Sequence, residues 1–212
     1  MPNLVLFLST VFLGFFAMLN PIGNTPVFLS LVGDADDKTM KRVAFKSVWV
    51  AFLVISVFSL FGHVIFRLFG LTLPAFQIAG GIIVFFIGYD LLQGETAKTQ
   101  SSDKKLPVDS FDDMAISPLG IPLLSGPGTI STAMNFVGEG KSFLYALLII
   151  FVFALVCFIT YLMFITSKKI ANKLSPSLIV VITKIMGLIL TVLAVQMVIQ
   201  GVFKVILEFP GK

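Results

Sequence analysis

Charged residues are scarce in this 212-residue chain: Asp, Glu, Lys and Arg make up 12% of it, while hydrophobic residues make up 57%. This composition excludes an ordinary water-soluble domain, in which about 25% of residues are charged. Two stretches, Met1 to Gly33 and Met114 to Gly138, carry no charged residue, and each is long enough to cross a bilayer. The composition therefore predicts an integral membrane protein.

Cysteine and histidine are also scarce, with one of each. A lone cysteine, Cys157, excludes an intrachain disulfide and a cysteine-based metal cluster, so we expect no metal and no cofactor. Sparse nucleophiles and bases argue against an enzyme. The net charge of +4 comes from scattered basic residues. They form no stripe that could follow a nucleic-acid backbone, so nucleic acid is not an expected partner.

The hydrophobic residues form six segments, which we expect to be transmembrane helices. A polar stretch, 94–113, is predicted to be a solvated cytoplasmic linker between two three-helix halves, 1–93 and 114–212. An even number of spans places both termini on one side of the membrane. The segments are Leu4 to Leu31, Val43 to Phe66, Leu73 to Leu92, Met114 to Val137, Phe143 to Thr166 and Leu178 to Phe203.

Lysine and arginine are distributed unevenly between the loops on the two sides. Cytoplasmic loops carry the excess of these residues, so we expect loops 1–2, 3–4 and 5–6 to be cytoplasmic. Both termini then lie outside the cell's inner (plasma) membrane. The loops expected to be cytoplasmic contain Lys38, Lys41, Arg42, Lys98, Lys104, Lys105, Lys168, Lys169 and Lys173. The opposite side contains Arg67, Lys141, Lys204 and Lys212.

Helix breakers interrupt the first and fourth segments. Asn20-Pro21-Ile22-Gly23-Asn24-Thr25-Pro26 lies in the first, and Gly126-Pro127-Gly128-Thr129-Ile130-Ser131-Thr132 lies in the fourth. Proline removes a backbone donor and glycine loosens the helix. Broken helix is tolerated at membrane depth only inside protein or beside a water-filled cavity. The two interruptions therefore predict a solute site.

The two halves align at a nearly constant offset, which predicts an internal repeat. Because each half has three segments, the second half enters the membrane from the opposite side. Inverted repeats with interruptions at matching places are typical of secondary transporters. A shift of 106 pairs Leu13-Gly14 with Leu119-Gly120, Pro21 with Pro127 and Thr25 with Ser131, and a shift of 107 pairs Ile78 with Ile185, Gly80 with Gly187 and Gln93-Gly94 with Gln200-Gly201.

Small residues seven positions apart recur in the third and sixth segments. Seven residues are about two helical turns, so each set lies on one face. Small faces allow close helix packing in lipid, and we expect the third and sixth helices to pack together. The residues are Gly81 and Gly88 in the third segment, and Gly187, Ala194 and Gly201 in the sixth.

The stretches from Asn20 to Leu29 and from Gly120 to Thr132 resemble the two signature motifs of the MarC family of six-span integral membrane proteins. The resemblance covers essentially the whole chain, including the polar central loop. The position of Asn20 is often Asp in that family, so a role that needs a charge there is in question. The resemblance implies membership of the wider LysE-type exporter superfamily, and hence movement of amino acids or similar small solutes.

The interruptions offer groups that suit a zwitterion. A half-helix N-terminus has free N–H groups and a partial positive charge, which suit a carboxylate, and freed carbonyls can accept from an ammonium group. The alternative is a pair of packing kinks whose polar side chains satisfy their own backbone. The expected substrate-binding residues are Asn20, Pro21, Gly23, Asn24, Thr25, Ser125, Gly126, Gly128, Thr129 and Ser131.

Asp90 and Lys184 are ionisable residues inside the third and sixth segments. We expect them to form an ion pair, because an Asp near a helix C-terminus opposes the helix dipole. One alternative is that Asp90 has a functional role in proton coupling. The other alternative is that the two side chains reach interfacial water separately, without pairing.

The predicted fold is an all-α membrane protein with six transmembrane helices arranged as two inverted three-helix repeats, with helices 1 and 4 broken. The predicted function is a secondary transporter that exports or exchanges small neutral amino acids or similar solutes by alternating access. A small-solute or ion channel is the main alternative, and an intramembrane enzyme is less favoured. The expected partners are a small-molecule substrate and the lipid bilayer, and a homo-oligomer stays open.

Overall fold

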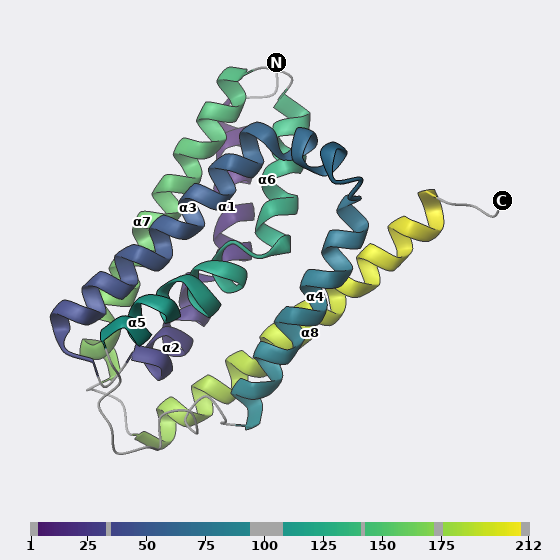
Figure 1. The fold of residues 1–212 in the computed structure, drawn as a ribbon. Helices are drawn as coiled ribbons and strands as arrows, with labels where there is room; N and C mark the ends of the chain where they lie inside the picture. The colour runs from purple at the N-terminus through teal and green to yellow at the C-terminus, as the bar shows by residue number, and fades with distance from the viewer. Residues whose placement is uncertain (1–3, 33–34, 94–107, 141–142, 172–175, 209–212) are drawn as a thin grey trace.

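The computed structural model describes residues 4–32, 35–93, 108–140, 143–171 and 176–208, and in these ranges the chain forms helices and no strand (Figure 1). The predicted all-α class is confirmed for this part of the chain. In order, the elements are α1 (Leu4–Leu19), α2 (Pro21–Val32), α3 (Asp37–Leu68), α4 (Leu73–Gln93), α5 (Val108–Met114), the π-helical segment η2 (Ala115–Leu124), α6 (Pro127–Gly140), α7 (Phe143–Ala171) and α8 (Pro176–Glu208).

Within the residues that the structure describes, five stretches are long and apolar enough to cross a bilayer. Large apolar side chains point outward from them, with Phe151 72% and Leu207 74% exposed. Such exposure is unfavourable in water, and a surrounding lipid phase removes the penalty. The protein is therefore a multi-pass membrane protein. The five stretches are Leu4–Val32, Asp37–Leu68, Leu73–Gln93, Leu144–Lys169 and Val180–Leu207.

The predicted fourth span is divided between η2 and α6, and the short helix α5 precedes it. α6 has 14 residues, fewer than the roughly 20 that a crossing helix needs. The described residues therefore contain five stretches long and apolar enough to cross, the first of them interrupted at Asn20, and the divided fourth segment is not among them. The divided segment also starts early, since α5 occupies the end of the stretch predicted to be a solvated linker. Residues 94–107 of that linker lie outside the described residues.

Polar contacts gather at the N-terminal end of α3. Asp36 caps this helix, accepting a hydrogen bond from the backbone N–H of Thr39 at 3.3 Å. Hydrogen bonds from the Thr39 side chain and nearby amides lower the pKa of the Asp36 carboxyl, so the cap is ionised at neutral pH. Asp112 of α5 lies 3.3 Å from Arg42 Nε and 3.4 Å from Lys46 Nζ. These ion pairs hold α5 against α3.

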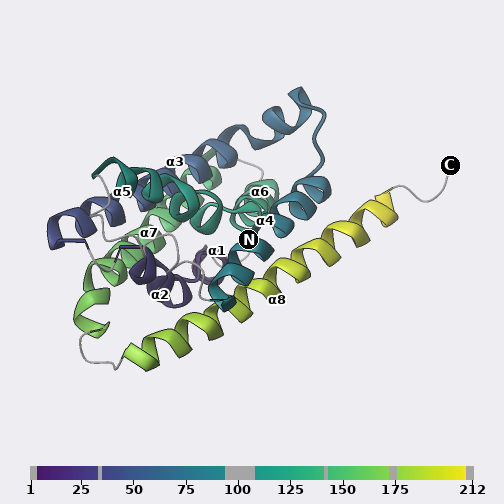
Figure 2. The ribbon, with the colours of Figure 1, turned by 60° about the horizontal axis from the view of Figure 1, so that its bottom comes forward.

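The small residues predicted to bring the third and sixth helices together do so. α4 and α8 pack along most of their length, as Figure 2 shows. A Cβ atom added to Gly187 would lie 2.8 Å from the backbone oxygen of Gly88, and one added to Gly201 would lie 2.9 Å from that of Pro74. Only glycine permits such backbone approach. The α4–α8 pair therefore forms one arm of the molecule.

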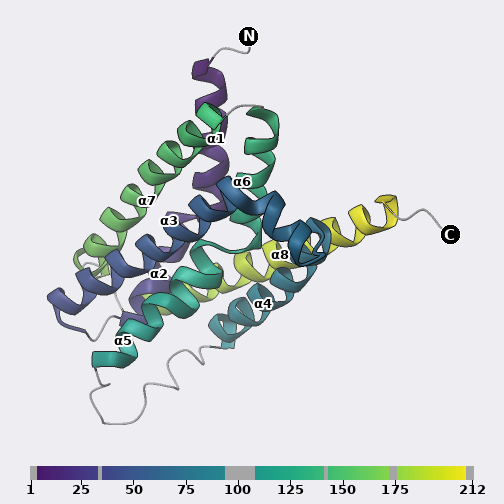
Figure 3. The same cartoon turned by 45° about the horizontal axis from the view of Figure 1, so that its top comes forward.

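The rest of the bundle is organised around α7. Phe15 of α1 packs against Phe153 with ring centroids 4.8 Å apart, and Phe28 of α2 stacks on Phe164 at 4.3 Å. α7 therefore supports the first broken helix on both sides of its interruption. α6 also packs beside α1, as Figure 3 shows, and the chain runs in opposite directions through these two helices.

Candidate site at the two helix interruptions

The first interruption is confined to one residue. α1 ends at Leu19, Asn20 has the unusual φ of +42°, and α2 begins at Pro21. The predicted interruption, Asn20 to Pro26, is therefore too long. A proline at the first helical position costs nothing, because its missing N–H would lack an intrahelical partner anyway. Pro26 lies inside α2 without ending it.

Side chains satisfy the backbone groups that this interruption frees. Asn20 Oδ1 accepts a hydrogen bond from the Gly23 N–H at 3.1 Å, and Asn24 Nδ2 donates to the Leu19 carbonyl at 2.6 Å. Thr25 Oγ1 donates to the Pro21 carbonyl at 2.7 Å. Asn24 is only 2% exposed, and its Oδ1 has no partner among the described residues. This interruption therefore contains one buried hydrogen-bond acceptor that no described residue satisfies.

The second interruption is larger than predicted. Ser117 and Ile121 of η2 have extended backbone conformations, and each precedes a proline joined by a cis peptide bond. Residues before proline disfavour the helical region, a signal present in the sequence that the prediction did not use. Ser125 closes the segment, because its N–H and its hydroxyl both donate to the Gly120 carbonyl, at 3.0 and 2.8 Å.

The two interruptions share one hydrogen-bonding arrangement. Thr129 Oγ1 donates to the carbonyl of Leu124, five residues earlier, at 3.1 Å. Asn24 makes the equivalent bond to Leu19, also five residues earlier. Both side chains reach back across the interruption to its last helical carbonyl. The offset between these bonds is 105 residues, one residue less than the shift of 106 that pairs Pro21 with Pro127.

The two interruptions also lie close together. A Cβ atom added to Gly128 would lie 3.4 Å from Met18 Sδ of α1 and 3.6 Å from Met197 Sδ of α8. The amides of Gly128 and Thr129 belong to the first turn of α6, so they have no partner within that helix. Gly128 is half-buried. This helix end, with its partial positive charge, is therefore flanked by two flexible thioether side chains.

α4 closes the site on one side. A Cβ atom added to Gly80 would overlap the ring of Pro127, so α4 and the start of α6 are in direct contact. Gln77, one turn earlier on α4, donates from Nε2 to Ser131 Oγ at 3.2 Å. Gln77 is 6% exposed, and its Oε1 has no partner in the described part of the chain.

Sequence reasoning missed Gln77. The available signal was that Gln77 is the sole strongly polar residue between Leu73 and Gly88. Its hydrogen bond joins the first half of the chain to the second. Of the predicted site residues, Ser131 alone is shown to bond outside its own segment.

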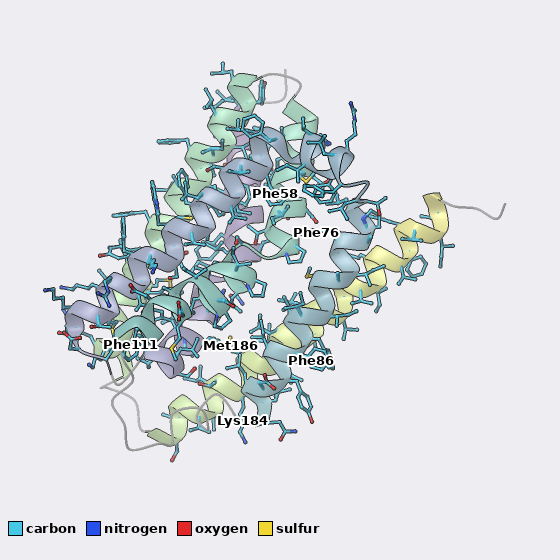
Figure 4. The ribbon with its side chains drawn as sticks, viewed as in Figure 1. Phe58, Phe76, Phe86, Phe111, Lys184 and Met186 are labelled. Atoms are coloured by element: carbon cyan, nitrogen blue, oxygen red, sulfur yellow. The ribbon has the colours of Figure 1, made fainter. Side chains whose placement is uncertain are left out.

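The predicted ion pair between Asp90 and Lys184 does not form. Both side chains are exposed, and neither has an ion pair with any described residue. The helix faces explain this outcome. Gly88 and Leu91 contact α8, and Asp90 is about 200° around the helix from Gly88. Figure 4 shows Lys184 near the start of α8, on the outer side of the arm.

These features define a multi-pass helical membrane protein with two interrupted helical segments and polar groups gathered where the interruptions meet. The sequence matches the model of the MarC family integral membrane proteins over residues 5–206. The chain belongs to this family.

Several relatives cover nearly the whole chain. A UPF0056 membrane protein of Bacillus subtilis, YvbG, is 38% identical over 206 residues, covering 94% of this chain and 97% of its own length. UPF0056 membrane proteins of Pyrococcus horikoshii (PH0760) and Methanocaldococcus jannaschii (MJ1677) are each 36% identical over 192 residues. These cover 91% and 90% of this chain, and 92% and 93% of their own lengths. No solved structure matches the chain.

Proposed function

We propose that this protein is a secondary transporter that exports or exchanges small neutral amino acids or similar small solutes by alternating access. The observation that carries the proposal is the meeting of the two helix interruptions, at which Gly128 lies against Met18 and Met197. Interrupted helices that meet within the membrane are the usual site of substrate binding in such transporters.

The groups at the interruptions suit the two ends of a zwitterion. The free amides at the start of α6 favour a carboxylate. The buried Oδ1 of Asn24 has no hydrogen-bond donor among the described side chains and amides, and an ammonium group would supply one. The site has no fixed charge in the described residues that line it, which favours a net-neutral ligand. The bond from Thr129 to Leu124 keeps the start of α6 in place.

Two further parts of the proposal concern topology. We infer that α5, η2 and α6 together make the sixth crossing, and that 1–93 and 114–212 are inverted repeats. The antiparallel course of α1 and α6 and the matched bonds of Asn24 and Thr129 support this inference. We place both termini outside the plasma membrane, because the excess of lysine and arginine lies in the opposite loops.

The repeat relation suggests how access alternates. Gln77 and Ser131 close the α4–α6 side of the site. The shift of 107 that pairs Gly80 with Gly187 pairs Gln77 with Lys184, and the shift of 106 pairs Thr25 with Ser131. In the alternate state we propose that Lys184 moves onto Thr25 while the bond between Gln77 and Ser131 breaks. Exchange of equivalent contacts is what inverted repeats permit.

The test of the proposed function is flux in proteoliposomes. The purified protein is assayed with a panel of labelled amino acids under imposed proton and sodium gradients. Saturable, gradient-driven flux of small neutral amino acids is expected. Non-saturating flux that ignores both gradients would favour the channel instead, and no flux of any solute would leave the proposal without support.

Gln77→Leu is expected to lower this flux at least about fivefold, the effect of losing a hydrogen bond worth about 1 kcal/mol. The reason is that Ser131 would lose its partner across the closed side of the site. Gln196→Leu is the matched control, because Gln196 is exposed on α8. Equal flux in the two variants would show that Gln77 has no part in the transport mechanism.

A further inference from the structure

An apolar groove lies away from the interruptions, between α3 and α7. Its volume is about 430 Å³. The side chains that line it include a continuous run of aromatic contacts, since Phe45 stacks on Trp49 at 6.2 Å and Trp49 stacks on Phe52 at 5.6 Å. Six of the lining residues are Phe45, Trp49, Phe52, Cys157, Phe158 and Tyr161.

The walls of this groove face outward and its floor is buried. Phe45 is 59% exposed, Trp49 49% and Phe158 56%, while Cys157 at the floor is 4% exposed. From Phe45 to Phe52 the groove wall rises about 10 Å along α3. One leaflet of hydrocarbon is about 15 Å thick, so the groove has the length and polarity that suit a lipid acyl chain.

Basic residues lie at one end of the groove. Lys41 is one turn before Phe45 on the same face of α3, and Lys169 is about three turns after Phe158 on the same face of α7. Both lysines are exposed, and neither has an ion pair with a described residue. Lys168, next to them, lies 3.8 Å from Asp37. The groove therefore ends at an excess of positive charge.

We propose that this groove binds an anionic phospholipid, with one acyl chain along Trp49 and the phosphate between Lys41 and Lys169. The distance of one helical turn between Lys41 and Phe45 fits the glycerol region that joins a phosphate to its first methylene groups. Basic pockets between transmembrane helices bind anionic head groups in the cytoplasmic leaflet. The distribution of lysine and arginine predicts that this end of the groove is cytoplasmic.

Trp49 makes the test specific, because it is the only tryptophan in the chain. The full-length protein is reconstituted in phosphatidylcholine vesicles containing increasing fractions of phosphatidylglycerol with brominated acyl chains. A parallel series contains brominated phosphatidylcholine. Bromine quenches tryptophan fluorescence on contact. Half-maximal quenching is expected at a mole fraction of the anionic lipid about threefold or more below that of the zwitterionic lipid.

Two double variants of equal charge complete the experiment. Lys41→Gln with Lys169→Gln is expected to abolish the preference for the anionic lipid, whereas Arg67→Gln with Lys204→Gln is expected to keep it. Equal quenching by the two lipids in the unmodified protein would overturn the proposal. Weak quenching by both would also overturn it, because the groove would then be covered by protein, such as a second copy of the chain.

Discussion

Gly80→Val is expected to lower the unfolding temperature of the protein in detergent by more than 10 °C or to prevent recovery of folded protein. A Cβ atom at this position overlaps the ring of Pro127, and both residues belong to helices packed on other elements. Overpacking of this kind costs about 3 kcal/mol or more when neither side can move. The valine also adds two methyl groups beyond that Cβ.

Ala79→Val is the control for this prediction. Ala79 precedes Gly80 on α4 and is exposed, so its valine variant adds methyl groups that meet no neighbouring helix. The unfolding temperatures of the two variants are compared by heating each protein and measuring, by size-exclusion chromatography, the fraction that stays folded. If Gly80→Val is as stable as Ala79→Val, then α4 does not pack on the start of α6 as described.

Thr129→Val is expected to reduce substrate flux by about fivefold to a hundredfold while leaving the protein folded. Valine has the shape of threonine but cannot donate, so the buried carbonyl of Leu124 loses its partner, at a cost of about 1–3 kcal/mol. The start of α6 then loses the bond that holds its free amides in position. Thr129→Ser keeps the donor and is expected to retain most of the flux.

Thr166→Val is the matched control for Thr129→Val. Thr166 donates to the carbonyl of Leu162 within α7, and it is exposed. Its valine variant loses a hydrogen bond of similar length at a site away from the interruptions. Initial rates in proteoliposomes at equal protein content compare the variants. Normal flux in Thr129→Val would contradict the role of the second interruption in substrate binding.

Composition and small-residue spacing predicted the parts of the fold that depend on burial in lipid. Charge-free runs predicted a membrane protein, and glycines seven residues apart predicted that α4 packs on α8. Both predictions succeed because a chain inside a bilayer has to form helices, and helices with small residues on one face pack closely there. Helix breakers located the two interruptions, the repeat offset related them to each other, and Asn24 and Thr129 make equivalent bonds there.

Other features could not be predicted because they depend on which way a helix faces. The positions of Asp90 and Lys184 in their segments indicated that the two residues lie at similar depth in the membrane, but not which way each side chain points. Because the Gly88 face of α4 packs on α8, Asp90 lies on the outward face of α4. Helix breakers likewise indicated where a helix is interrupted but not how many residues the interruption includes. Pro21 begins a helix, whereas Pro118 and Pro122 disturb one. The bond from Gln77 to Ser131 joins residues 54 positions apart.

The most direct test is whether water and substrate reach the point where the two interruptions meet. Gly128→Cys, in a chain whose native Cys157 is replaced by alanine, adds a thiol where only ordinary contacts with Met18 and Met197 exist. In reconstituted protein, we expect a charged, membrane-impermeant thiol reagent to modify this cysteine, and a transported amino acid to slow the modification. Ala79→Cys, on the outer surface of α4, should stay unmodified in lipid. A Gly128→Cys thiol that is equally unreactive, or whose reaction no amino acid slows, would contradict a water-accessible substrate site between the two broken helices.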